Sequence, residues 1–286
     1  MSIVITAASG HFGHLAVNAL LDKGVDPQTI VAAARTVEKV DDLAAKGVRT
    51  AKIDYDDPDG LRKAFEGASK VLLISGNEFG KRTAQHRNVI EAAKAEGVEL
   101  LAYTSVLDAD RSPLFVAPEH RETEAILRDS GVPAVILRNG WYTENYVDVV
   151  RQGIATGKIV SAANDGKVAS ASRADYAEAA AQVLIGEGHA GKTYEFSGDE
   201  AWTYADLAAV ATKIGGKDVE YVNLTPDELK TTLTEAGVPE GGVAYEVQTA
   251  IDTANGALAL QTGDLARVLG HPTTSLETVL RRELGE

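Results

Sequence analysis

Short apolar runs alternate with longer amphipathic segments through the first half of the chain. The runs are rich in Val, Ile, Leu and Ala, which is typical of buried strands. The longer segments repeat apolar residues at helical spacing, which indicates helices with one buried face. The predicted strands are Ile3–Ile5, Thr29–Ala34, Val48–Ile53, Val71–Ser75, Val98–Thr104 and Ala134–Arg138. The predicted helices are a segment from Leu15 that ends at Gly24, then Val37–Lys46, Pro58–Phe65, Lys81–Glu96 and Glu119–Asp129.

Single helices between successive strands predict right-handed crossovers and a parallel sheet covered on both faces. This is the doubly wound α/β architecture of Rossmann folds. Ligands of such sheets bind beyond the carboxyl ends of the strands. Candidate functional residues are therefore sought where each strand ends.

The second half follows a looser pattern. We expect a Rossmann domain over residues 1–140 and a smaller, discontinuous, substrate-covering lobe over residues 141–286, with residues 164–186 returning to the first domain. The predicted helices are Trp141–Ile154, Ala174–Ile185, Tyr204–Ile214, Pro226–Ala236 and Ser275–Leu284. The predicted strands are Ile159–Ala162, Thr193–Phe196 and Val219–Asn223, and Glu240–Leu260 is expected to mix helix and loop.

The turn after the first strand is a candidate phosphate site. Gly10 and Gly13 precede the first helix, whose free N–H groups and dipole suit a pyrophosphate. Gly13 lets the helix pack close to the strand. Ala7 occupies the first glycine position of a Gly-x-x-Gly-x-x-Gly pattern, and we expect its φ to be negative. The alternative is an ordinary strand-to-helix turn.

Arg35 closes the second strand, where dinucleotide folds meet the adenosine ribose. An acid at this position suits NAD, whereas an arginine accommodates the 2′-phosphate of NADP. The alternative for Arg35 is an arginine that is simply solvated at the surface. Lys39 can add positive charge nearby, or it can simply lie on the face of a helix.

Polar residues close the third and fourth strands as well. Asp54 can accept a hydrogen bond from an adenine amino group, with Tyr55 packed nearby, or it can belong to an acidic helix cap. Ser75, Gly76 and Asn77 can lie along a nicotinamide ribose, or they can form a plain polar loop.

Tyr103-Thr104-Ser105 ends the fifth strand. Ordinary short-chain reductases place a serine here and a Tyr-x-x-x-Lys pair on the next helix, where the lysine lowers the tyrosine pKa. No tyrosine in this chain has a lysine four residues later. The matching helix carries His120 and Glu124 one turn apart, which indicates a surface ion-paired helix or, alternatively, a proton relay.

The segment from Leu137 to Tyr146 gathers amides, aromatics and a glycine directly after the sixth strand. A nicotinamide and an acceptor would meet at this place. The alternative is a hinge between the lobes, with Trp141 as a core residue.

Composition narrows the classes of function. The chain has 286 residues, 44% hydrophobic and 24% charged, with a formal charge of −14 and no cysteine. These values argue against disulfides, thiolate chemistry and binding to nucleic acid or an anionic membrane. We predict no metal site, no membrane insertion, no signal peptide and a cytoplasmic location. A Gly-x-Ser-x-Gly elbow, which hydrolases would need, is missing.

Taken together, these residues resemble the NmrA-like branch of atypical short-chain dehydrogenases/reductases, in particular the NAD(P)H:quinone oxidoreductase 2 group and its triphenylmethane reductase cousins. The segments that carry the resemblance are Gln85–Ile90, Tyr103–Ser105, Leu137–Tyr142, Asp165–Tyr176 and Gly270–Leu276. The chain departs from the group at Ala7 and at His11-Phe12, where the group has Gln-Leu.

The resemblance implies NADPH bound at the first turn, with Arg35 on its phosphate and further contacts from later loops. Family members differ in activity, and some bind the dinucleotide only to sense it. The implied coenzyme-binding residues are Thr6, Ala8, Ser9, Gly10, His11, Phe12, Arg35, Asp54, Ser75, Gly76, Asn77, Asn139, Gly140, Trp141, Tyr142, Ser170 and Arg173.

The missing Tyr-Lys pair favours acceptors that need little acid assistance. Hydride addition to a ketone builds a localised alkoxide, whereas a quinone gives a delocalised anion and a cationic dye is neutralised. We therefore expect direct hydride transfer from NADPH to a quinone-like acceptor without flavin, in a pocket shaped by Asn139, Trp141, Tyr142 and Asn145. Tyr142, Tyr103 or solvent would supply the proton. The candidate catalytic residues are Tyr142, Asn139, Ser105 and His120.

Two other functions stay open on the sequence. One is an NADPH-dependent carbonyl (alcohol) reductase that uses Tyr142 or His120 as its acid. The other is a regulator that senses NADP(H) without turnover. The expected partner is a small molecule (quinone, ketone or dye), and the expected state is a monomer or homodimer.

Overall fold

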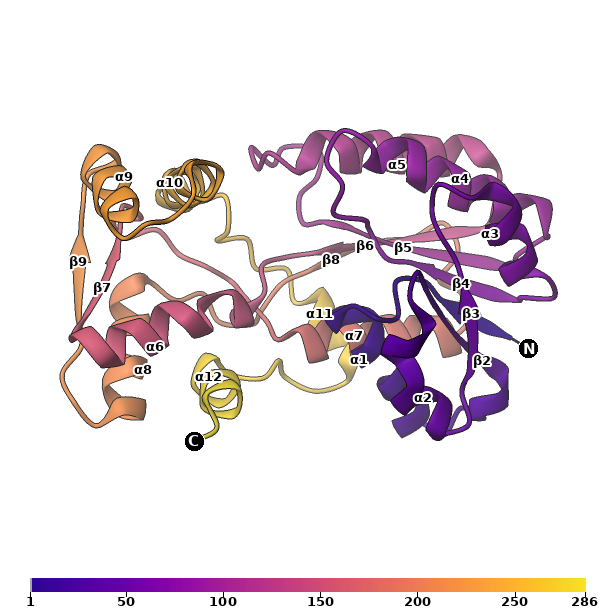
Figure 1. The fold of residues 1–286 in the computed structure, drawn as a ribbon, viewed down its shortest axis with the longest axis horizontal. Helices are drawn as coiled ribbons and strands as arrows, with labels where there is room; N and C mark the ends of the chain where they lie inside the picture. Colours follow the sequence, from indigo (N-terminus) through magenta and orange to yellow (C-terminus); the bar gives the residue numbers. More distant parts are fainter. Residues whose placement is uncertain (1) are drawn as a thin grey trace.

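A parallel seven-stranded sheet forms the centre of the larger lobe in the computed structural model, which describes residues 2–286 (Figure 1). Its order is β3-β2-β1-β4-β5-β6-β8. The order reverses beside β1, between β1 and β4, and this switch point is where doubly wound folds bind nucleotides. The strands are β1 (Ile3–Ile5), β2 (Ile30–Ala34), β3 (Arg49–Lys52), β4 (Lys70–Leu73), β5 (Leu100–Val106), β6 (Ala134–Asn139) and β8 (Thr193–Phe196).

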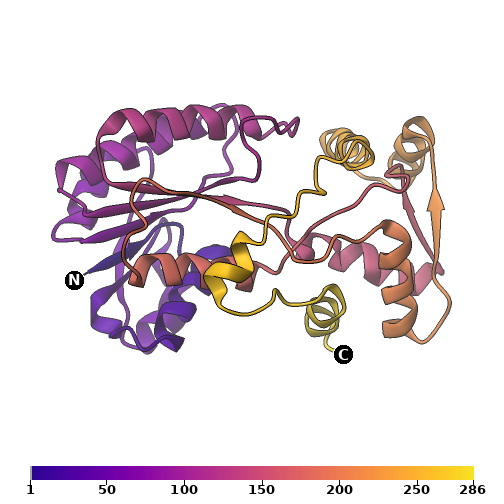
Figure 2. The same cartoon turned by 180° about the vertical axis from the view of Figure 1, so that it is seen from behind.

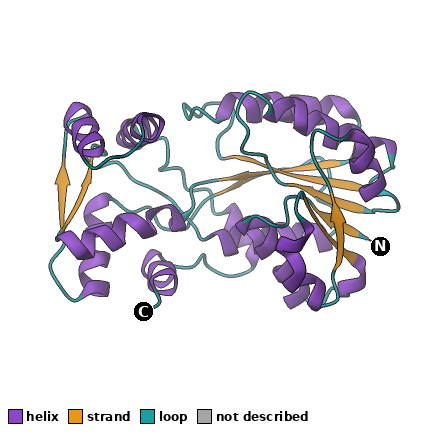
Figure 3. Ribbon diagram, viewed as in Figure 1, coloured by secondary structure: helices purple, strands orange, loops and turns teal. Residues whose placement is uncertain are grey.

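Helices cover both faces of this sheet (Figure 3). One face packs against α1 (His11–Asp22), α2 (Asp41–Ala45), α7 (Arg173–Ile185) and α11 (Asp264–Leu269). The other face packs against α3 (Pro58–Phe65), α4 (Arg82–Ala95) and α5 (Ala117–Ser130). Strands buried on both sides explain the continuous apolar runs of the sequence.

The smaller lobe has its own apolar core around Trp202, Leu207 and Leu280. It contains a short parallel pair, β7 with β9, and helices that lie away from the main sheet (Figure 1). Figure 2 shows the chain returning from this lobe so that α11 lies against α7. The elements are α6 (Val147–Thr156), β7 (Lys158–Ser161), α8 (Tyr204–Gly215), β9 (Glu220–Asn223), α9 (Pro226–Glu235), α10 (Glu240–Ala254) and α12 (Leu276–Leu284). The 3-10 turns are η1 (Pro27–Thr29), η2 (Val37–Val40) and η3 (Thr143–Tyr146).

Two predictions of local structure are wrong, and one helix was not predicted. Residues 37–46 are not one helix, because the backbone of buried Val40 leaves the helical region (φ −124°, ψ 20°) between η2 and α2. Trp141 and Tyr142 are extended rather than helical, since the Ala171 N–H donates to the Trp141 carbonyl at 3.1 Å. Helix α11 has no predicted counterpart.

The turn between β1 and α1 also differs from the prediction at Ala7. Its φ is +48°, in the left-handed region that favours glycine, so the expectation of a negative φ is wrong. The Ala8 N–H donates to the Ala33 carbonyl at 2.9 Å, which ties the strained turn to β2. A Cβ on Gly13 would lie 2.5 Å from the Ala7 carbonyl oxygen, so only glycine lets α1 start this close to the turn.

A buried ionic network lies between α5 and the sheet, so the prediction of a surface ion-paired helix at His120 and Glu124 is wrong. Glu124 is fully buried and accepts hydrogen bonds from Ser105 Oγ at 2.6 Å and Arg138 Nε at 2.9 Å. These ionic hydrogen bonds raise the pKa of Arg138. A buried carboxylate needs such partners to offset its desolvation.

Two histidines lie in the same interior. His120 Nδ1 is 2.7 Å from the Tyr103 hydroxyl, and His86 Nδ1 is 3.0 Å from Thr123 Oγ1. Burial lowers the pKa of each imidazole to about 3, helped by the positive charge of Arg82. Both rings are therefore neutral hydrogen-bonding groups at neutral pH.

Ala7→Gly should stabilise the protein. Glycine adopts the left-handed backbone without the penalty of about 1–2 kcal/mol that alanine pays in the folded state. It also raises the conformational entropy of the unfolded chain, which lowers the free energy of unfolding by about 0.5–1 kcal/mol. We expect a net gain of about 0.5–1 kcal/mol in the free energy of unfolding by urea denaturation. Ala8→Gly is the control, since Ala8 is buried without a positive φ and should lose stability. A destabilised Ala7→Gly protein would contradict the strain argument.

His120→Gln should flatten the loss of stability in acid. The folded pKa of His120 near 3 lies below the unfolded value of about 6.5, so its contribution is complete above pH ~6.5. It then falls by about 1.4 kcal/mol per pH unit as the pH drops toward 3. Urea titrations at several pH values should show a shallower slope in the variant. Parallel pH profiles would show that His120 does not titrate in this way.

Candidate active site

A cleft of about 610 Å³ opens at the carboxyl ends of β1, β2 and β4, at the switch point of the sheet. Most of the predicted coenzyme contacts meet there, although they come from six separate stretches of sequence. The lining residues are Ala7, Ser9, Gly10, His11, Phe12, Gly13, Arg35, Ile53, Asp54, Tyr55, Ile74, Ser75, Gly76, Asn77, Glu78, Arg82, Gln85, Thr104, Tyr142 and Arg173.

The amino end of α1 faces this cleft with free backbone donors. Gly10 is the N-cap residue, no side chain caps it, and the first turn contains no acidic residue. The N–H groups and the helix dipole are therefore free to bind an anion. Because Gly13 and Gly10 carry no side chain, a diphosphate can approach the backbone closely.

Arg35 reaches across the mouth of the cleft to Glu78. Its Nη1 is 3.0 Å from Glu78 Oε1, and its side chain is 65% exposed. An exposed ion pair of this kind is weak and exchanges readily for another anion. Asp54 lines the same end, and its carboxylate accepts the Asp56 N–H at 3.0 Å. The cap of α3 is Asp57, which accepts the Gly60 N–H at 3.1 Å, and the contact of Asp54 with adenine stays a prediction.

The loop at Ser75–Asn77 is held by groups that sequence reasoning did not identify. The Ser75 N–H donates to Thr104 Oγ1 at 2.9 Å. The Gly76 N–H donates to His86 Nε2 at 2.9 Å, and Arg82 Nε donates to the Gly76 carbonyl at 2.7 Å. Neutral His86 and buried Arg82 thus hold the backbone N–H and the backbone carbonyl of Gly76, which lies beside the cleft.

Tyr142 forms the inner wall of the cleft. Its ring packs 6.4 Å from that of Phe12 and 5.4 Å from that of Tyr176, and the Arg173 guanidinium lies 4.8 Å from its centroid. Burial raises the pKa of Tyr142, while the positive charge of Arg173 acts in the opposite direction. The phenol is therefore protonated at neutral pH.

Asn139 ends β6 and lies close behind Tyr142, outside the lining of the cleft. Its side chain is 5% exposed, yet within residues 2–286 neither Nδ2 nor Oδ1 has a hydrogen-bond partner. Buried amides are normally paired. An unsatisfied amide beside Tyr142 is an observation in favour of a polar ligand, such as a nicotinamide carboxamide.

Several predicted residues do not line the cleft. Thr6 and Ala8 are buried beneath the first turn, where Thr6 Oγ1 donates to the Leu72 carbonyl at 2.9 Å. Ser170 lies 2.8 Å from Thr143 Oγ1, and Gly140 packs beneath Phe196 and Tyr176. These residues support the walls of the site from behind.

Ser105 and His120 are also behind the walls. Ser105 donates to Glu124, and His120 contacts the cleft only through Arg82, whose Nη1 is 3.4 Å from His120 Nε2. Neither side chain lines the cleft, so the structure does not support the catalytic roles that were predicted for them.

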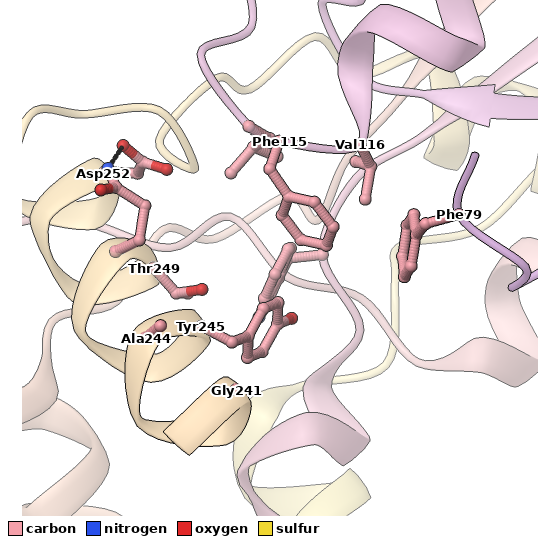
Figure 4. A pocket seen from close by; sticks show the side chains of 11 residues that line it. Phe79, Phe115, Val116, Gly241, Ala244, Tyr245, Thr249 and Asp252 are labelled. Carbon is pink, nitrogen blue, oxygen red and sulfur yellow. Dashed lines mark hydrogen bonds between the residues drawn. The ribbon is translucent and has the colours of Figure 1, made fainter. Parts of the chain in front are cut away.

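A second cavity, of about 640 Å³, lies between α10 and the loops of the larger lobe (Figure 4). Its walls adjoin those of the cleft, because Phe79 follows Glu78 and Trp141 precedes Tyr142. Most of its lining is apolar or aromatic, and sequence reasoning identified only Trp141 among its residues. The lining residues are Phe79, Leu114, Phe115, Val116, Trp141, Gly241, Ala244, Tyr245, Gln248, Thr249 and Asp252.

Within residues 2–286, His, Asp and Glu side chains do not gather in threes as metal ligands. Over the same residues, none of the helices combines the length and apolarity that crossing a bilayer requires.

The chain is similar to known NAD(P)H-binding proteins over most of its length. A family described as NAD(P)H-binding matches residues 7–186. The chain is 46% identical to quinone oxidoreductase 2 of Escherichia coli (strain K12) over 274 residues, which cover 96% of each chain. The crystal structure of the E. coli NADPH-dependent quinone oxidoreductase complexed with NADPH matches with a TM-score of 0.93 at 44% identity, covering 99% of each chain.

The triphenylmethane reductase of Citrobacter sp., complexed with NADP(H), is also similar. Its structure matches with a TM-score of 0.93 at 36% identity and covers 98% of this chain and 99% of that chain. The resemblance drawn from the sequence is therefore confirmed, and the chain belongs to the NAD(P)H-binding family, within the NmrA-like group of quinone oxidoreductase 2 and the triphenylmethane reductases.

Proposed function

We propose that this protein is an NADPH-dependent oxidoreductase that transfers hydride directly to a quinone-like or conjugated dye acceptor without flavin. One observation carries the proposal. A polar cleft with free helix N–H groups and an apolar cavity share two walls, at Glu78-Phe79 and Trp141-Tyr142. A dinucleotide and an aromatic acceptor can meet where these walls adjoin. The relatives named quinone oxidoreductase and triphenylmethane reductase support the same reaction class.

The residues of the cleft fit NADPH along its length. The turn at Ser9–Phe12 would hold the pyrophosphate, and Arg35 would hold the 2′-phosphate through its planar fork of donors. Ser75–Asn77 would contact the nicotinamide ribose. The side-chain amide of Asn139 would form hydrogen bonds with the carboxamide of the nicotinamide. Tyr142 and Arg173 would close the inner wall.

The chemistry divides between coenzyme and protein. When bound, the reduced nicotinamide supplies the hydride. Trp141, Phe79 and Phe115 bind and orient the acceptor and exclude water from the cavity. Tyr142 keeps its phenolic proton and can donate it to the reduced acceptor, so that hydride and one proton together convert quinone to hydroquinone.

The two alternatives differ from this proposal in what is turned over. A carbonyl reductase with His120 as its acid gains no support, because His120 lines neither cavity, whereas one with Tyr142 would reduce isolated ketones as well as quinones. A regulator that senses NADP(H) would bind the coenzyme and leave every acceptor unreduced. A panel of quinones, ketones and cationic dyes assayed with NADPH and NADH separates all three functions. The cytoplasmic location and the monomeric or homodimeric state stay predictions.

Arg35→Ala should weaken NADPH binding by about 10- to 100-fold, because each charged hydrogen bond to the 2′-phosphate is worth about 1.5–3 kcal/mol. NADH, which has no such phosphate, should bind within about twofold of the wild type. Calorimetric titration with both coenzymes measures the effect. Arg49→Ala is the matched control, since Arg49 is exposed at the far end of β3. An equal loss for both coenzymes would contradict the phosphate contact.

Glu78→Gln should have the opposite effect on NADPH. The carboxylate competes with the 2′-phosphate for Arg35 across a contact of 3.0 Å. Without this competitor, NADPH affinity should rise about two- to fivefold, as expected for an exposed ion pair, while NADH affinity stays the same. Weaker NADPH binding in the same titration would mean that Glu78 supports the coenzyme instead of competing with it.

Tyr142→Phe and Asn139→Ala should each lower kcat/KM for quinone by about tenfold or more, because they remove a proton donor and a polar contact to the nicotinamide. Tyr146→Phe is the control, since Tyr146 packs in the apolar core of the smaller lobe against Trp202 and Tyr204. Full activity in both site variants would show that the assignment of these residues is wrong.

A further inference from the structure

The second cavity, which the proposed function assigns to the acceptor and which we call the acceptor cavity, has one acidic side chain in its wall, Asp252. Asp252 is 6% exposed, and its Oδ1 accepts a hydrogen bond from Gln248 Nε2 at 2.8 Å (Figure 4). Within residues 2–286, no Lys, Arg or His nitrogen lies within 4.0 Å of its carboxylate. The cavity lining contains no basic residue.

A buried carboxylate without a cation is unfavourable unless something else stabilises it. One amide donor serves one of its two oxygens, and each carboxylate oxygen can accept two hydrogen bonds. The proposed mechanism does not use Asp252. The second carboxylate oxygen of Asp252 can therefore accept hydrogen bonds from a ligand in the cavity.

The cavity is elongated along helix α10. Its lining residues Gly241, Ala244, Tyr245, Gln248 and Asp252 follow one another at helical spacing along one face of α10, a length of about 16 Å. Phe79, which adjoins the coenzyme cleft, and Asp252 lie on opposite sides of the close-up (Figure 4). An acceptor of two or three fused or linked rings can place one end beside the cleft and the other beside Asp252.

Aromatic faces along the way also favour positive charge. Phe79 and Phe115 have ring centroids 4.9 Å apart, and Tyr245 packs edge-on against Phe115 at 5.7 Å. All three side chains line the cavity and are partly exposed, and the Arg82 guanidinium lies over the Phe79 ring, 4.6 Å from its centroid, so the Phe115 and Tyr245 rings are the ones without a cation. Aromatic faces attract cations as well as other rings.

We propose that Asp252 makes this site selective for aromatic acceptors that carry a cationic or N–H-bearing nitrogen at the end remote from the reacting ring. The inference rests on the proposed function and names the substrate class of that same site. The cationic group binds and does not react, and the quinone ring still takes up hydride and one proton to become hydroquinone. A carboxylate or sulfonate at the same end is rejected by like charge.

Three naphthoquinones with the same ring and linker test the proposal. Their linkers end in trimethylammonium, tert-butyl or sulfonate, so that charge varies at nearly constant shape. With saturating NADPH, kcat/KM for the ammonium compound should exceed that for the tert-butyl compound by about tenfold or more in the wild type. The ratio should fall to within about threefold in Asp252→Asn, which retains the partner for Gln248. Asp252→Glu, which keeps the charge, should retain most of the preference.

The net charge of −14 attracts any cation, and Glu240→Gln controls for this general effect. Glu240 is exposed on the same helix and does not line the cavity, so its loss should leave the ratio unchanged. A non-reducible naphthalene with the same ammonium linker gives a second readout, because its binding should quench Trp141 and weaken about tenfold in Asp252→Asn.

The outcomes separate the two proposals. If the ammonium and tert-butyl quinones are reduced equally well and Asp252→Asn changes nothing, the role of Asp252 is overturned and the proposed reaction stands. If no quinone is reduced but the naphthalene cation still depends on Asp252 for binding, the reaction is overturned and the role of Asp252 stands.

Discussion

The contact between Gly13 and the Ala7 carbonyl is the constraint on which the coenzyme site depends. A single added Cβ would come within 2.5 Å of that oxygen and push α1 away from the turn. With glycine in place, the helix begins directly beneath the cleft and directs its free N–H groups into it. Ala7 accepts a left-handed φ of +48° to close the same turn. The strained backbone of Ala7 thus accompanies the tight turn that leaves room for a phosphate between the strand and the helix.

The segment from Ser75 to Phe79 joins the two halves of the site. Its first residues line the coenzyme cleft, and Phe79 lines the acceptor cavity. His86 and Arg82 hold it at Gly76, and the Arg82 guanidinium lies 4.6 Å from the Phe79 ring centroid. Because both groups are buried and hydrogen-bonded, this loop keeps a defined shape between two open spaces. The interior histidines therefore act on the site by positioning the loop, without contact with either ligand.

Local sequence signals predicted the sheet and most of the coenzyme cleft. The strands follow apolar runs, Pro58–Phe65 begins at a proline and has the predicted bounds, and Arg35 lies where a parallel strand ends. The failures lie where distant segments decide the outcome. The φ of Ala7 depends on a hydrogen bond from its neighbour to Ala33. The spacing of His120 and Glu124 could not reveal that Ser105 and Arg138 bind the Glu124 carboxylate in the interior, or that Tyr103 pairs with His120.

The acceptor cavity shows the same limit. Its walls come from α10, from the loop before α5 and from Phe79, and only their meeting in space makes Tyr245 or Asp252 part of a site. The central claim is that hydride passes directly between two ligands in these adjoining spaces. Single-turnover oxidation of 4-deuterated NADPH by a naphthoquinone, with flavin-free protein, tests it most directly. A primary isotope effect with one deuterated face and none with the other is predicted, whereas a reaction that requires added flavin would contradict the claim.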